Sequence, residues 1–122
     1  MTKPKIKKPT LPKLLKKADK VFSLYIRNRD KKCVCCGATE NLQNGHLIKR
    51  GRKSIRFHEK NCNCQCASCN IKHNHYTEFY TNWFIKKYGQ AEYEALIEQS
   101  KELKKFTIME LEELIKKYDK PL

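Results

Sequence analysis

Two short cysteine motifs, Cys33-Val34-Cys35-Cys36 and Cys66-Ala67-Ser68-Cys69, decide how this chain folds. Each contains a C-x-x-C pair, and two such pairs are typical ligands of one tetrahedral structural zinc ion. The chain has seven cysteines and no apolar leader that resembles a signal peptide. Thiols of a protein kept in a reducing compartment bind metal more often than they form disulfides. We therefore predict a cytoplasmic protein with one structural Zn²⁺, held by Cys33, Cys36, Cys66 and Cys69.

Three further cysteines, Cys35, Cys62 and Cys64, lie between or beside these pairs. Cys35 or Cys64 can in principle replace a ligand, but the four chosen residues form two pairs with identical spacing. The role of the other three stays open. A chain of 122 residues is one domain by length and has a small core, so a metal staple would stabilise it.

The positive charge of the chain is confined to its first half. Residues 1–61 carry 18 Lys or Arg against 4 Asp or Glu, whereas residues 62–122 carry 9 of each, so the whole formal charge of +14 lies in the first half. A charge that only aided solubility would not segregate in this way. The segregation indicates a polyanionic partner, most simply nucleic acid. The alternative is a basic surface without a partner. No apolar run is long enough to span a membrane.

Hydrophobic spacing predicts an α+β fold with a short β-hairpin. We expect a flexible basic arm at residues 1–13, which holds three prolines and five lysines, and one domain at 14–122. The expected elements are a helix from Leu14 to about Arg29, a strand at Leu42–Ile48, a return strand around Ile55 and Phe57, and helices from Tyr76 to Tyr88, from Gln90 to about Lys101, and after a capping box at Thr107–Glu110.

The segment expected between the two strands is strongly basic, and no acidic residue occurs from Asn41 to His58. Arginine and lysine in such a loop are typical phosphate contacts. We expect the DNA backbone to lie along the side chains of Lys49, Arg50, Arg52, Lys53 and Arg56.

His46 follows a glycine in the first strand, and the near-neutral reference pKa of histidine allows it to take a proton from water. Asn70 directly follows the last zinc cysteine, and its amide oxygen suits Mg²⁺ or Mn²⁺. His73 falls on the helix face of Asn70, and His75 comes two residues later. One base, one divalent ion and nearby cations suffice for phosphodiester hydrolysis. Spacing alone leaves a nuclease and a nucleic-acid-binding module equally open.

The order C-x-x-C, Gly-His, Asn, and Gln-Cys-x-x-Cys-Asn resembles the HNH, or ββα-metal, nucleases. More closely, the chain resembles the phage lambda NinG (Rap) recombination protein family. The matching segments are residues 33–37, 43–48, 56–61, 65–70, 80 and 88–90, flanked by helices at 18–30 and 106–112. The resemblance implies a zinc-stabilised ββα-metal core and a DNA endonuclease that cuts branched recombination intermediates such as Holliday junctions. Paired cuts would suit a homodimer in the cytoplasm of a bacterial host.

The resemblance places His46 as general base, makes Asn61 the residue that orients the site, and supports Asn70 as a ligand of the catalytic ion. This chain departs from the family pattern at two places. Related nucleases often carry an acidic residue just before the base, where this chain has Gln43-Asn44-Gly45, so weaker metal binding is expected. Where the family commonly has Gly-Asn, this chain has His75-Tyr76, so the third site residue is His73 or His75. The competing hypotheses are a zinc-stabilised nucleic-acid-binding module and a zinc interaction domain without DNA.

Overall fold

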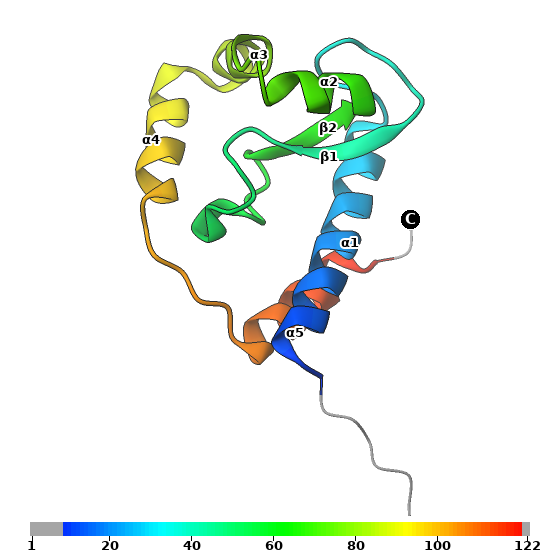
Figure 1. Ribbon diagram of the computed structural model, residues 1–122, viewed down its shortest axis with the longest axis vertical. Helices are drawn as coiled ribbons and strands as arrows, with labels where there is room; N and C mark the ends of the chain where they lie inside the picture. The colour runs from blue at the N-terminus through cyan, green and yellow to red at the C-terminus, as the bar shows by residue number, and fades with distance from the viewer. Residues whose placement is uncertain (1–8, 121–122) are drawn as a thin grey trace, which may run out of the picture.

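The computed structural model describes residues 9–120, which form five α-helices and a two-stranded antiparallel sheet (Figure 1). This confirms the predicted α+β class. Within this part of the chain, no helix is long and apolar enough to cross a membrane. The elements are α1 (Leu11–Asp30), β1 (Leu42–His46), a short 3-10 turn η1 (Lys53–Ile55), β2 (Cys62–Cys66), α2 (Ala67–His73), α3 (Glu78–Tyr88), α4 (Gln90–Ser100) and α5 (Ile108–Tyr118).

Helix α1 begins at Leu11, three residues before the predicted start, because Pro12 suits the first turn of a helix. The last residues of the predicted arm therefore belong to α1, and residues 1–8 lie outside the described part. The helix buries Leu14, Ala18, Phe22 and Ile26, which recur every four residues. The first two pack on Leu111 and Ile115 of α5, and the last two pack on Cys62 and Cys64 of β2.

The hairpin pairs β1 with β2 so that Leu42 lies opposite Cys66 and His46 lies opposite Cys62. The return strand predicted around Ile55 and Phe57 is wrong. Ile55 ends η1, and its side chain is fully buried in the core, so the apolar alternation there came from a turn that packs inward. The true return strand is β2, which the alternation rule missed because all five of its residues are buried.

Strand β2 places cysteines and amides on alternate faces. Cys62 and Cys64 face the apolar side of α1, whereas Asn63 and Gln65 face the remainder of the domain. Figure 1 shows α1 beside the hairpin and α2 directly after β2, while Tyr80 of α3 and Cys35 contact the amide face of the strand. The strand is thus buried on both sides.

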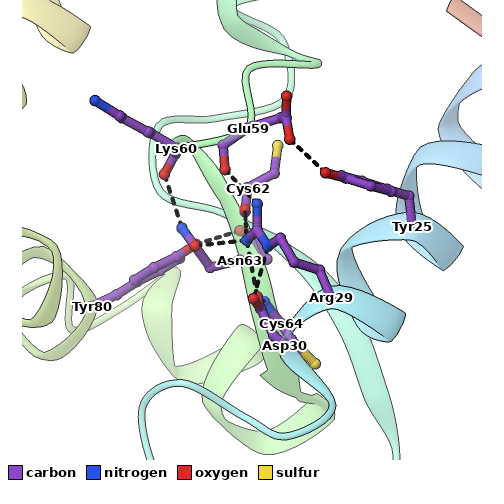
Figure 2. A network of polar contacts seen from close by, with 10 residues as sticks. Tyr25, Arg29, Asp30, Glu59, Lys60, Cys62, Asn63, Cys64 and Tyr80 are labelled. Atoms are coloured by element: carbon purple, nitrogen blue, oxygen red, sulfur yellow. Dashed lines mark hydrogen bonds and ion pairs between the residues drawn. The ribbon is translucent and has the colours of Figure 1, made fainter. Parts of the chain in front are cut away.

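A polar network joins the end of α1 and the helix α3 to the hairpin (Figure 2). The Arg29 guanidinium donates to the carbonyls of Glu59 and Cys62, each at 2.9 Å, and to Asn63 Oδ1 at 3.0 Å. On α3, the buried Tyr80 hydroxyl accepts from Asn63 Nδ2 at 3.1 Å and donates to the Gly45 carbonyl at 2.6 Å. These bonds fix α1, α3 and both strands relative to one another.

The C-terminal helices complete the core. Tyr80 and Phe84 of α3 and Leu96 of α4 pack with Leu47 and Ile55. Two helix ends are also as predicted: α3 is capped by Gly89 at φ 97°, and α5 opens with the capping box of Thr107 and Glu110.

Gly45 lies where the two strands pack closely against each other. A Cβ at this position would lie 2.0 Å from Gln65 Oε1 and 2.8 Å from its Cγ, and Gln65 is buried. We expect Gly45→Ala to lower the free energy of unfolding by about 1–3 kcal/mol, because the packed side chain cannot move aside. Urea denaturation followed by circular dichroism measures this loss.

The matched control is Gly51→Ala, since a Cβ there meets no atom within 4 Å in the described chain. It should change stability little. Equal stability of Gly45→Ala and Gly51→Ala would show that the hairpin is more loosely packed than described.

Candidate metal centre and cleft

Four cysteines converge at one end of the hairpin. The sulfurs of Cys33, Cys36, Cys66 and Cys69 all lie within 4.8 Å of one another, and Cys36 Sγ is 3.7 Å from Cys66 Sγ. Four sulfurs at about 2.3 Å from a central zinc ion would be about 3.8 Å apart. The four residues therefore fit a structural Zn²⁺, and they are the set predicted from the spacing.

Local backbone geometry shapes this cluster. Gly37 has a φ of 80°, which closes the turn after Cys36, and its N–H donates to the Cys33 carbonyl at 2.9 Å. Cys66 caps α2, since its sulfur accepts from the Cys69 N–H at 3.4 Å. Burial raises the pKa of Cys33, but the backbone N–H groups of Cys66, Cys36 and Cys35 outweigh it and lower that pKa to about 7, which favours the thiolate that metals bind.

The three remaining cysteines lie outside the cluster. Cys62 and Cys64 are fully buried against α1, and burial raises the pKa of both thiols, that of Cys64 to about 11. They act as small apolar side chains. Cys35 is partly buried against the core, and its sulfur accepts from Gln65 Nε2 at 3.4 Å.

The second site feature is a cleft of about 1090 Å³ beside the hairpin. It is lined by His46 of β1, by Asn70 and His73 of α2, and by Lys49 and Arg50 of the loop after β1. Residues predicted to act together, but separated by up to 27 positions, thus share one cavity. His75 is exposed and does not line it, which separates His75 from His73.

The imidazole of His46 is held in one tautomer. Its Nε2 lies 3.0 Å from the main-chain carbonyl oxygen of Arg56. A carbonyl only accepts, so Nε2 carries the proton and Nδ1 keeps a lone pair. Burial lowers the pKa of His46, although the Arg56 carbonyl and the Asp19 carboxylate oppose this effect. The ring is therefore neutral at pH 7 and able to accept a proton at Nδ1.

The two α2 residues of the cleft offer donor atoms to a cation. His73 Nε2 lies 2.8 Å from the Leu47 carbonyl, and its Nδ1 is buried without a hydrogen-bond partner in the described residues. A histidine that donates one N–H to a carbonyl is oriented as metal-binding histidines commonly are. Asn70 Nδ2 donates to Gln43 Oε1 at 2.8 Å, which leaves the Asn70 amide oxygen for a ligand. Asn70 Oδ1 and His73 Nδ1 are thus the two atoms of α2 that keep a lone pair for a ligand.

Asn61 is buried away from the cleft and acts on the backbone. Its side chain accepts from the Ile48 N–H at 2.8 Å and donates to the carbonyls of Ile48 and Ile55 at 3.1 and 3.2 Å. These bonds join Ile48 and Ile55, which lie at the two ends of the basic loop. The residue after Ile55 is Arg56, whose carbonyl contacts the imidazole of His46. Asn61 is thus placed to orient the site through the loop.

The predicted DNA-contacting residues divide into two groups. Lys49, Arg50, Arg52 and Lys53 are exposed. Arg56 is only 9% exposed, and its guanidinium forms a two-pronged ion pair with Asp19 of α1, with Nε to Oδ1 at 2.9 Å. Its predicted role in phosphate binding is therefore corrected: Arg56 holds the loop to α1.

Sequence reasoning missed Asp19. It is the one acidic residue among the described residues that line the cleft. Its position in a lysine-rich helix, 27 residues before His46, has no motif to mark it. An acidic residue on the otherwise apolar side of an amphipathic helix is the available signal.

Replacing Cys66 with serine tests the metal centre. Cys66→Ser should lose zinc and most of its helical signal, because zinc binding is coupled to folding in small metal-stapled domains. Metal analysis of the purified protein and circular dichroism measure the two effects. Cys35→Ser is the control and should keep one zinc ion per chain. A folded, zinc-loaded Cys66→Ser protein would refute the ligand set.

Comparison with known proteins identifies a family. The family model described as Bacteriophage Lambda NinG protein matches residues 2–122. Searches of curated proteins and of solved structures found no match. The match covers both cysteine pairs, the hairpin and all five described helices. The chain therefore belongs to the NinG family of bacteriophage lambda.

Proposed function

We propose that this protein is a metal-dependent endonuclease that cuts branched or structured DNA in phage recombination. Membership of the NinG family suggests a recombination-related phage protein. The observation that carries the nuclease proposal is His46, a neutral imidazole that lines a cleft edged by exposed cations and whose Nε2 bonds to a carbonyl, so that Nδ1 keeps the lone pair. The order β1, β2, α2 also supports a ββα-metal core.

In the proposed reaction, His46 Nδ1 takes a proton from a water molecule, which then attacks the phosphorus of the scissile phosphodiester. The Arg56 carbonyl stabilises the imidazolium that forms, because it accepts a hydrogen bond from Nε2–H. Asn70 Oδ1 and His73 Nδ1 would hold the catalytic Mg²⁺ or Mn²⁺. When bound, that ion supplies positive charge for the phosphate and the departing oxygen. Lys49 and Arg50 add charge at the cleft edge.

Branched DNA is favoured over a defined sequence. The exposed cations of the loop would contact phosphates, which carry no sequence information. Resolution of a junction needs two cuts, so we propose that two copies of the chain act together on such a substrate.

His46→Ala tests the assignment of the base. We expect cleavage of a four-way junction in Mg²⁺ or Mn²⁺ to fall by about 10²–10⁴-fold, because the general base is lost. Junction binding, measured in Ca²⁺ by fluorescence anisotropy, should change little. His75→Ala is the matched control, since His75 is exposed outside the cleft, and it should cleave normally. Unchanged cleavage by His46→Ala would show that another group is the base, whereas binding without cleavage by the wild-type chain would leave a binding module as the function.

The pH dependence gives an independent check. Burial lowers the pKa of His46 below its ordinary value of 6.5, so the reactive neutral form persists below that pH. The cleavage rate should level off toward neutral pH and fall in acid, with a midpoint below 6.5. Single-turnover rates across this range measure the midpoint, and circular dichroism checks that the fold persists. A midpoint well above 6.5 would mean that another group is the base.

A further inference from the structure

Three large apolar side chains project into solvent beside the cleft. Ile71 is 62% exposed, Tyr76 60% and Phe79 62%. They belong to the end of α2, the turn after it and the first turn of α3. Tyr80 and Phe84, which also belong to α3, are fully buried. Phe79 is therefore exposed although other aromatic rings of the same helix lie in the core. Exposed apolar groups gathered in this way mark a contact surface.

The exposed group lies partly at the cleft and partly at a neighbouring hollow. Ile71 lines the cleft, while Tyr76 and Phe79 line a separate hollow of about 180 Å³ next to the cysteine cluster. His73 lines both cavities. Helix α2 therefore contributes to the walls of both cavities, and a DNA strand that crosses this short helix can contact both.

The charges around both cavities favour an anion. Lys72 lines the hollow, and its Nζ lies 4.0 Å from the centroid of the Phe79 ring. Among the described residues, no carboxylate lines the hollow, and the one in the cleft, Asp19, is paired with Arg56. The surface thus offers flat aromatic rings with cations beside them. An unpaired nucleotide has the matching chemistry, a flat base and an anionic phosphate.

We propose that Tyr76 and Phe79 form a stacking site for an unpaired base of the DNA strand whose backbone enters the cleft. The inference deepens the proposed function, on which it rests, by naming the feature of structured DNA that the protein selects. Stacking on aromatic rings is available to every base, so the site recognises single-stranded character and not sequence. Lys72 contacts the phosphate next to the stacked base. The protein accordingly prefers DNA with unpaired bases next to the bond that it cuts.

Binding to two matched DNA molecules tests this site. The probes are a duplex with a short single-stranded gap and the same duplex fully paired, both labelled and titrated in Ca²⁺. The wild-type chain should bind the gapped DNA more tightly. Tyr76→Ala and Phe79→Ala should each weaken binding to the gapped DNA by about 5- to 100-fold and leave paired-duplex binding nearly unchanged, since one base loses one aromatic partner.

Two variants serve as controls. Tyr76→Phe keeps the ring and should bind as the wild type does. Met109→Ala removes another exposed apolar side chain, 70% exposed on α5 and outside both cavities, and should also change nothing. Equal affinity of Tyr76→Ala and the wild type for gapped DNA, or equal losses on gapped and paired DNA, would overturn the stacking site. Equal losses together with a shift from dimer to monomer would assign these rings to a contact between two copies.

The two proposals can fail separately. Selective loss of gapped-DNA binding in the alanine variants, without any cleavage by the wild type in Mg²⁺ or Mn²⁺, would support the stacking site and refute the nuclease. Cleavage that depends on His46, with no selective loss in the variants, would do the reverse.

Discussion

The structure depends on a buried strand whose every second residue is an amide. Asn61, just before β2, and Asn63 and Gln65 within it are 0–1% exposed. A buried amide without hydrogen bonds costs about 1–3 kcal/mol, so partners must come from elsewhere in the domain. They come from the basic loop for Asn61, from α1 and α3 for Asn63, and from the first cysteine turn for Gln65. The polar face of one strand thereby sets the position of its neighbours.

The hydrogen bonds of these buried amides also hold the residues of the proposed site in place. His46 lies opposite Cys62, at the end of β1 where Asn61 closes the basic loop. The loop in turn presents the Arg56 carbonyl to the imidazole, and the Asp19–Arg56 pair ties it to α1. A base on a strand, oriented by a carbonyl with its own support, needs little rearrangement to react. Asn70 and His73 stand on α2, which follows the cluster cysteine Cys66 directly.

The features that could be predicted from the sequence are those that depend on local interactions. Cysteine spacing, the α1 stripe from Leu14 to Ile26 and the Thr107 cap each depend on nearby residues, and each was predicted. Strand β2 was missed because all five of its residues are buried, and Asn63 within it bonds to distant partners, Tyr80 and Arg29, which no periodicity reveals. The role of Arg56 was misjudged for the same reason, since Asp19 lies 37 residues away. Charge alone could not separate a paired arginine from a free one.

The lack of an acidic residue just before His46 determines which atoms of the cleft are available to a divalent ion. The donors proposed for a divalent ion, Asn70 Oδ1 and His73 Nδ1, are neutral, and the carboxylate of Asp19 is neutralised by Arg56. Mg²⁺ in phosphoryl chemistry is commonly held by one or two carboxylates together with substrate phosphates. With fewer protein charges, the DNA phosphate must supply more of the negative ligation. Under the proposed function, the ion and the DNA backbone therefore bind together, and an electropositive cleft that draws in DNA also completes the metal site.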